Sequence, residues 1–185
     1  MSDIAILKEM IKDTATVPLT KNNYGKNQVI LEEASDYSVT VNGMPDNDQV
    51  IVIKTDAFSA SNAVFKGNRG ECKRADFVII ADTDTKKRII FIELKAKKDS
   101  ETEIIQQLTG AQCFVAYCQE IGRKFWQQKS FLDNYQSRFV SIGHINVPKR
   151  KTRIERSTDN HDSPERMLKI DWPDYIEFNH LAGRK

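Results

Sequence analysis

Two apolar runs of strand length lie in the middle of the chain. Residues 77–81 and 89–92 are entirely aliphatic or aromatic, and the polar residues 82–87 separate them. Short apolar runs bounded by turn-forming residues are typical of buried strands. The pattern therefore predicts a β-hairpin, in which the start of the first strand lies beside the end of the second.

The remaining periodicity predicts a succession of helices and strands. Residues 3–13 have the apolar spacing of an amphipathic helix. A second helix is predicted to begin after a capping box formed by Ser100 and Glu103 and to end at Gly122. Residues 28–34 fit either a short helix or a strand. Further strands are predicted at residues 37–41, 49–55, 138–147, 167–171 and 175–178, with loops at 14–26, 59–70 and 149–166.

Composition favours one domain spanning residues 1–185. Hydrophobic residues make up 39% of the chain and charged residues 29%, as in ordinary soluble proteins. Neither a membrane-spanning stretch nor a secretion signal is recognisable. Three scattered cysteines fit a reducing compartment better than a disulfide framework, so we expect a cytoplasmic protein without membrane contact.

The net charge of +2 does not by itself indicate a nucleic-acid-binding protein, but the basic residues are clustered. Any one cluster is explained as a solvated surface. Together they favour nucleic acid, because basic groups around a phosphodiester supply affinity that is independent of sequence. The clusters are Lys66, Arg69, Lys73 and Arg74; Lys86, Lys87, Arg88, Lys95, Lys97 and Lys98; and Lys149, Arg150, Lys151, Arg153 and Arg156.

Acidic residues and a lysine stand at one end of the predicted hairpin. Asp76 opens the first strand, and Glu93 and Lys95 close the second. Side chains alternate along a strand, so Glu93 and Lys95 share one face while Leu94 lies on the other. Two carboxylates and an ammonium group at one place suit a hard divalent cation and a phosphodiester. The competing interpretations are a solvated strand end and a buried salt bridge from Glu93 to Lys95 or Arg88.

This arrangement resembles the PD-(D/E)XK nuclease superfamily. Its motif is an acid at the start of one strand, then acid-x-lysine on the next strand, followed by a supporting helix. The resemblance covers roughly residues 70–145, and Ala75 stands where the family often has proline. It implies a restriction-endonuclease-like α/β fold, in which helices flank a central mixed β-sheet in the order α-β-β-β-α-β.

The resemblance also implies a metal site for Mg²⁺ or Mn²⁺. Its ligands would be the carboxylates of Asp76 and Glu93 and the main-chain carbonyl of Leu94. The family usually adds an acid from an upstream helix. Glu32 and Glu33 are the adjacent pair that could supply it, and we favour Glu33.

Two further residues receive roles from the resemblance. Lys95 would lie near the attacking water and stabilise the charge that develops on the phosphate. Many relatives carry a glutamine on the supporting helix that points back at the site. Gln107 borders the apolar stripe of that helix and is the preferred candidate, with Gln106 and Gln112 as alternatives.

Taken together, the sequence predicts a Mg²⁺-dependent phosphodiesterase, expected to be an endonuclease that cuts DNA in preference to RNA. Defence, restriction and repair are all compatible roles, and specificity could come from a homodimer or a partner protein. One alternative is a catalytically silent subunit that binds nucleic acid. The other is a protein-interaction module whose acids form ion pairs. The aromatic residues Phe125, Trp126 and Phe131 are expected in the core or at an oligomer contact.

Overall fold

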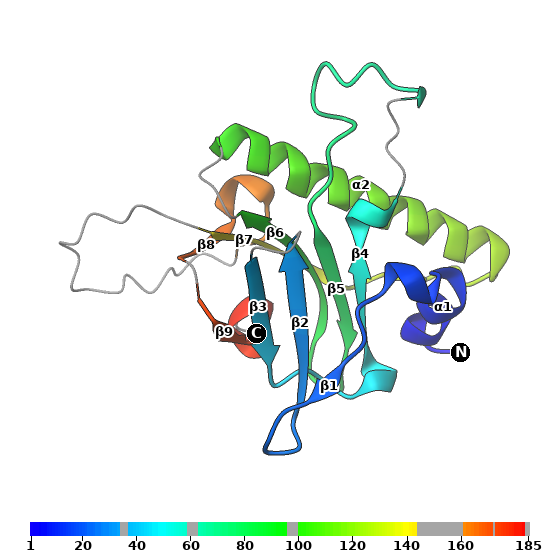
Figure 1. Cartoon of the computed structure of the whole chain (residues 1–185). Helices are drawn as coiled ribbons and strands as arrows, with labels where there is room; N and C mark the ends of the chain where they lie inside the picture. The colour runs from blue at the N-terminus through cyan, green and yellow to red at the C-terminus, as the bar shows by residue number, and fades with distance from the viewer. Residues whose placement is uncertain (34–36, 59–62, 96–99, 144–160, 172, 184–185) are drawn as a thin grey trace.

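The computed structural model describes residues 1–33, 37–58, 63–95, 100–143, 161–171 and 173–183. Within these residues the chain is an α/β protein with two mixed β-sheets and three α-helices (Figure 1). None of the described helices combines the length and apolar character needed to span a membrane. The predicted α/β class is confirmed.

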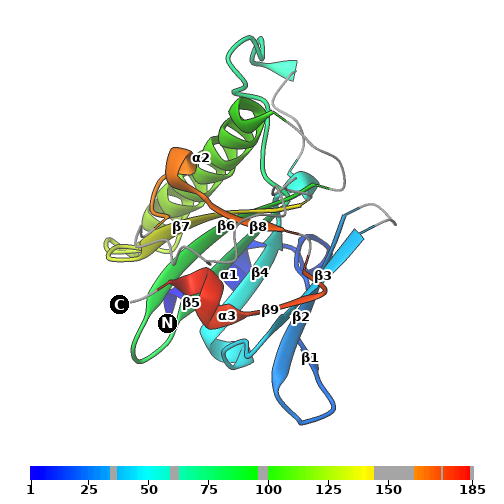
Figure 2. The same cartoon turned by 90° about the vertical axis from the view of Figure 1, so that its left-hand side faces the viewer.

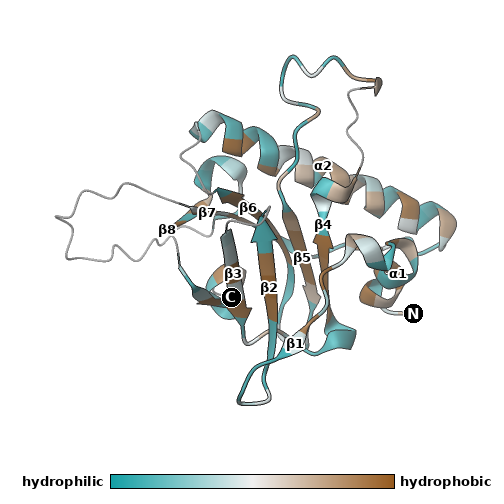
Figure 3. Ribbon diagram, in the orientation of Figure 1, coloured by the Kyte–Doolittle hydropathy of each residue, from teal (hydrophilic) through white to brown (hydrophobic). Residues whose placement is uncertain are grey.

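The larger sheet has five strands in the spatial order β4-β5-β6-β7-β8. The first three strands are antiparallel, and β6, β7 and β8 run parallel. Strands β4 and β5 are largely brown, and therefore apolar, in Figure 3. The strands are β4 (Val50–Lys54), β5 (Phe77–Asp82), β6 (Lys87–Lys95), β7 (Gln136–Gly143) and β8 (Leu168–Asp171).

Helices α1 (Asp3–Met10) and α2 (Glu101–Phe125) cover one face of this sheet. The predicted start of α2 is confirmed with Ser100 as its N-cap, since the Ser100 hydroxyl accepts a hydrogen bond from the Glu103 amide at 3.2 Å; the reciprocal half of a capping box stays a prediction. The predicted end of this helix at Gly122 is wrong. A β-carbon at that position would lie 2.2 Å from the ring of Phe131, so the glycine makes room for a buried aromatic residue within a continuing helix.

A second, four-stranded sheet covers the opposite face, as Figure 2 shows. Its order is β1-β2-β3-β9, and the short helix α3 packs beside it. The sequence predicted helices flanking a single sheet and did not anticipate this layer. The elements are β1 (Thr20–Lys21), β2 (Asn27–Glu33), β3 (Tyr37–Asn42), β9 (Tyr175–Glu177) and α3 (Phe178–Ala182).

Shorter 3-10 helices connect these elements at η1 (Asp13–Ala15), η2 (Asn47–Gln49), η3 (Thr55–Ala57) and η5 (Pro164–Arg166). Residues 144–147 of one predicted strand, and most of the predicted charged loop at 149–166, lie outside the described residues. The predicted strand at 175–178 is divided between β9 and α3, because Phe178 begins the last helix.

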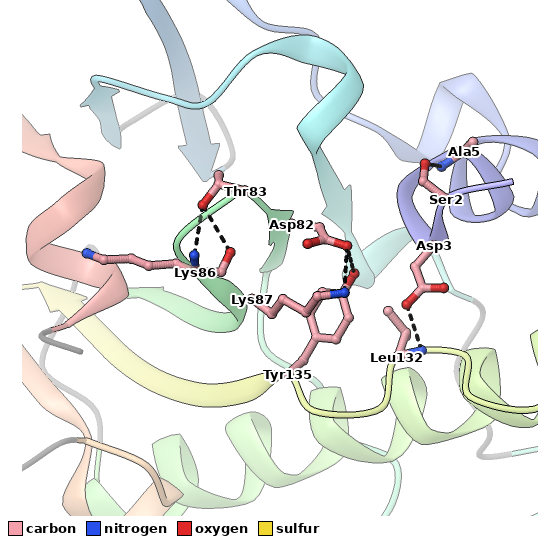
Figure 4. A network of polar contacts seen from close by, with 9 residues as sticks. All are labelled: Ser2, Asp3, Ala5, Asp82, Thr83, Lys86, Lys87, Leu132 and Tyr135. Atoms are coloured by element: carbon pink, nitrogen blue, oxygen red, sulfur yellow. Dashed lines mark hydrogen bonds and ion pairs between the residues drawn. The ribbon is translucent and has the colours of Figure 1, made fainter.

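The predicted hairpin is confirmed, and polar contacts hold its turn (Figure 4). The Thr83 hydroxyl accepts from the Lys86 amide at 3.0 Å. Asp82 accepts from Lys87 and from the Tyr135 hydroxyl, each at 3.0 Å. These contacts lie at the opposite end of the hairpin from Asp76 and fix the pairing of the two strands.

Helix α2 approaches the segment before β5 very closely at Gly110. A β-carbon at this position would lie 1.8 Å from the main-chain oxygen of Lys73. We expect Gly110→Ala to lower the free energy of unfolding by about 1–3 kcal/mol through overpacking, although alanine favours helix. Urea denaturation of this variant beside Gln112→Ala, at an exposed position of the same helix, tests it. Equal or greater stability of Gly110→Ala would contradict the close contact.

Candidate active site

Strand pairing places Asp76 opposite Glu93. In the antiparallel β5–β6 pair, Phe77 faces Ile92, so the next pair outward is Asp76 with Glu93. The β-carbons of directly opposed residues are about 4.5–5.5 Å apart. The main-chain amide of Leu94 donates a 2.7 Å hydrogen bond to Asp76 Oδ2 and joins the two strand ends. The hairpin therefore gathers these residues as the sequence predicted.

The three motif side chains also share one face of the sheet. Val78 and Ile89 pack in the core beneath helices α1 and α2, whereas Ile92 and Leu94 pack toward the second sheet. Because side chains alternate along a strand, Asp76, Glu93 and Lys95 belong to the helix-covered face. The site is thus formed where the end of β6 meets the start of β5 beneath α2.

Glu93 is the most unusual group in the site. Its side chain has no exposed surface, and its Oε1 lies 2.7 Å from the Lys95 ammonium nitrogen. Apart from this contact of Oε1 with Lys95, neither carboxylate oxygen has a hydrogen-bond partner in the part of the chain that the structure describes. Buried carboxylates are normally both paired and hydrogen-bonded. Glu93 therefore retains the capacity to bind a further cation.

The environment raises the pKa of both carboxyl groups. Burial raises the pKa of Glu93 to about 8, the charge of Asp76 adds to the shift, and Lys95 opposes it. Burial also raises the pKa of Asp76 to about 6, against the stabilising hydrogen bond from Leu94. Two mutually repelling, desolvated carboxylates favour either a retained proton or a positive ion between them.

Two more acids approach this pair. The charge of Glu33 raises the pKa of both Asp76 and Glu93, and that of Asp56 raises the pKa of Asp76. The resemblance implied a helical acid, but Glu33 ends strand β2, so that expectation is wrong. Strand alternation leaves Glu33 half-buried and Glu32 exposed, which favours Glu33 of the two.

Asp56 is a neighbour that the sequence analysis missed. It lies in η3, immediately after β4. The amide of Thr55 donates to the main-chain oxygen of Asp76 at 2.9 Å, and its hydroxyl donates to Ala75. Since β4 runs antiparallel to β5, an acid just after β4 must lie near Asp76. The sequence pattern that could have identified Asp56 is an acidic residue shortly after an apolar strand.

The donor set fits a divalent cation held by few protein ligands. Within the described ranges, no three His, Cys, Asp or Glu side chains are grouped closely enough to hold a metal ion. Mg²⁺ usually takes one or two carboxylates and completes its shell with water and phosphate oxygens. Asp76 and Glu93 provide such a pair, and ligation by Glu33 or by the Leu94 carbonyl stays a prediction.

Of the three candidate glutamines, Gln107 is the one that is hydrogen-bonded to the segment leading into Asp76. Its main-chain oxygen accepts a 2.8 Å hydrogen bond from the amide of Ala75. Its side-chain Oε1 is buried and has no hydrogen-bond partner among the residues described. Gln106 instead packs against Gly70, and Gln112 is exposed. The preference for Gln107 agrees with these positions, and its catalytic role stays a prediction.

Several residues of the three basic clusters are paired or buried and so are not available to bind a nucleic acid, and others lie outside the described residues. Lys73 pairs with Glu103 at 2.9 Å, and Lys87 pairs with Asp82. Arg88 is buried toward α3 and donates to the Ala182 carbonyl at 2.9 Å, so the proposed alternative pairing of Glu93 with Arg88 is wrong. Residues 97–98 and the cluster at 149–156 lie outside the described residues.

Comparison of the chain with protein-family models, with curated proteins and with solved structures gives no match. The likeness to the nuclease superfamily therefore rests on the motif residues, their placement and the order of the elements that carry them.

The raised pKa of Glu93 predicts a pH-dependent stability. Between its ordinary pKa of 4.5 and about 8, the folded protein retains a proton that the unfolded chain releases. Without metal, the free energy of unfolding should therefore fall as pH rises, by about 1.4 kcal/mol per pH unit from this group. Urea denaturation in EDTA between pH 5 and about 9 should show a flatter dependence for Glu93→Gln.

The control for this measurement is Glu32→Gln, which removes an exposed acid from the end of β2. It should follow the parent protein at every pH. A Glu93→Gln profile with the same slope as the parent would show that Glu93 does not hold a raised pKa.

Proposed function

We propose that the protein is a metal-dependent phosphodiesterase with a restriction-endonuclease-like core. The observation that carries this proposal is Glu93, a fully buried carboxylate beside Asp76 whose oxygens meet no partner among the described residues other than Lys95. The chain runs from α1 through β1, β2 and β3 of the second sheet to β4, β5, β6, α2 and β7. Apart from those three inserted strands, this order follows the α-β-β-β-α-β pattern of the superfamily, which supports the proposal. The motif makes DNA the expected substrate.

In this proposal Asp76 and Glu93 hold Mg²⁺ or Mn²⁺. A bound divalent ion lowers the pKa of its water and offsets the charge of the phosphate. The protein supplies a largely enclosed site, since Glu93 is fully buried and Lys95 is only 19% exposed. Charges placed in such surroundings act more strongly than they would in water.

Lys95 has the complementary role of an electrostatic stabiliser. Its ammonium group is fixed at 2.7 Å from Glu93 and lies on the same face of the sheet as both carboxylates. When the carboxylates are shared with a metal ion, Lys95 can donate to a phosphate oxygen as negative charge develops there. Gln107 of α2, whose main-chain oxygen accepts a hydrogen bond from the amide of Ala75, would orient a group beside Asp76.

A protein-interaction module is the second function with an observation in its favour. The Glu93–Lys95 contact is the ion pair that such a module would contain. It leaves Glu93 Oε2 without a hydrogen-bond partner in the described structure. Burying an oxygen in this way lowers stability, and an ion pair with a purely structural role has no benefit to offset that loss. We therefore favour the nuclease over the interaction module.

Cleavage of nucleic acid tests the proposal directly. With Mg²⁺ present, the parent protein should cut labelled DNA. Asp76→Asn and Lys95→Ala should each lower the cleavage rate by at least about a hundredfold, because the first removes an anionic ligand of the metal ion and the second removes a positive charge from the reacting phosphate. Binding in EDTA should change little. The measurement is gel analysis of single-stranded, duplex and branched DNA, and of RNA.

The matched control is Asp84→Asn, which removes an exposed acid at the other end of the same hairpin. It should cut like the parent. Cleavage by both Asp76→Asn and Lys95→Ala at the parental rate would refute the assignment of the site.

Metal binding can be measured without catalysis. Calorimetric titration of Mn²⁺ should show saturable binding, which Glu93→Gln weakens by about tenfold or more and Asp84→Asn does not change. Binding should tighten between pH 6 and about 8, because both carboxylates must lose their protons before they ligate. Equal Mn²⁺ affinity in the parent and Glu93→Gln would favour the interaction module.

A further inference from the structure

An exposed aromatic cluster lies beside the candidate site. The ring centroid of Phe58 is 5.2 Å from that of Phe114 and 6.3 Å from that of Tyr117. The guanidinium carbon of Arg74 stands 5.1 Å from the Phe58 centroid. Phe114 is buried, whereas Phe58 is 39% exposed and Tyr117 is 56% exposed. The buried ring of Phe114 thus supports Phe58, which in turn lies beside Tyr117, and solvent reaches the last two rings.

The chain connects this cluster directly to the motif residues. Phe58 follows η3, the 3-10 helix that contains Asp56. Arg74 precedes Asp76 by two residues. The amide of Phe58 donates to the main-chain oxygen of Thr55 at 3.2 Å, and the amide of Thr55 donates to that of Asp76 at 2.9 Å, so both connections lead to Asp76. A nucleic acid whose phosphate lay at Asp76 would have neighbouring nucleotides within reach of the cluster.

The charge of Arg74 is available to a ligand. No carboxylate in the described part of the chain pairs with it, and its buried Nε has no hydrogen-bond partner there. The neighbouring Lys73, by contrast, is bound to Glu103. An arginine stacked on an aromatic ring keeps its outer donors free for phosphate oxygens.

We propose that Phe58, Tyr117 and Arg74 form a platform for unpaired nucleotides, hereafter the Phe58 platform. The two rings stack on bases, and Arg74 binds an adjacent phosphate. Bases inside a duplex are stacked on one another, so such a platform selects single-stranded nucleic acid or strands with unpaired ends. The inference rests on the proposed function and adds the class of substrate.

Binding in EDTA tests the Phe58 platform separately from cleavage. The full-length protein is titrated against a labelled single strand of about 20 nucleotides and against the duplex of the same sequence. Phe58→Ala and Tyr117→Ala should each weaken single-strand binding by about five- to tenfold and leave duplex binding unchanged. Phe58→Trp should bind like the parent, because it keeps a stacking surface.

The matched control is Phe125→Ala, which removes an aromatic residue that is 78% exposed at the far end of α2. Its affinity for both nucleic acids should equal that of the parent. Arg74→Ala should reduce the salt dependence of single-strand binding by about one phosphate contact. The melting temperature of each variant shows whether it is folded.

The outcomes separate the two proposals. If Asp76→Asn abolishes cutting but folded Phe58→Ala, Phe58→Trp and Tyr117→Ala all bind single strands like the parent, the platform is refuted and the nuclease stands. If the parent never cuts but Phe58→Ala weakens single-strand binding and Phe58→Trp does not, the platform stands without the nuclease. Loss of self-association in Phe58→Ala, with unchanged nucleic-acid binding, would assign the cluster to a contact between copies of this chain and overturn the platform.

Discussion

The antiparallel pairing of β5 with β6 is the constraint on which the candidate site depends. It sets Asp76 opposite Glu93, and strand alternation then places Lys95 on the same face. A shift of the pairing by one residue would turn Glu93 toward the second sheet and separate it from Asp76. The contacts of Asp82 with Lys87 and Tyr135 hold the register from the other end of the hairpin.

The site is maintained at a cost in stability. Glu93 is buried against a like charge, and its pKa rises because the apolar core cannot solvate an anion. Such a group persists where the surrounding structure enforces its position, and apolar strands on either side do so. A sequence optimised for stability alone would place an apolar residue there, so the buried carboxyl group agrees with the proposed metal site.

The surroundings of the site come from parts of the chain that are far apart in sequence. Gly110 lets α2 approach the segment that precedes Asp76, and β2 brings Glu33 from the second sheet. Asp56 lies in η3 directly after β4 and Phe58 follows it, so an acidic and an aromatic residue both come from the segment that Thr55 joins to Asp76 by a hydrogen bond. This proximity relates the proposed chemistry to the proposed selection of unpaired nucleotides.

The sequence by itself determined the hairpin, the capped start of α2 and the meeting of Asp76, Glu93 and Lys95, because these follow from periodicity and pairing over short separations. Only the tertiary structure decided that residues 27–33 form a strand, because their partner β3 and the facing sheet bury one side. It also decided that α2 continues past Gly122, where the ring of Phe131 fills the space. Such choices depend on contacts between distant segments, which local pattern does not encode.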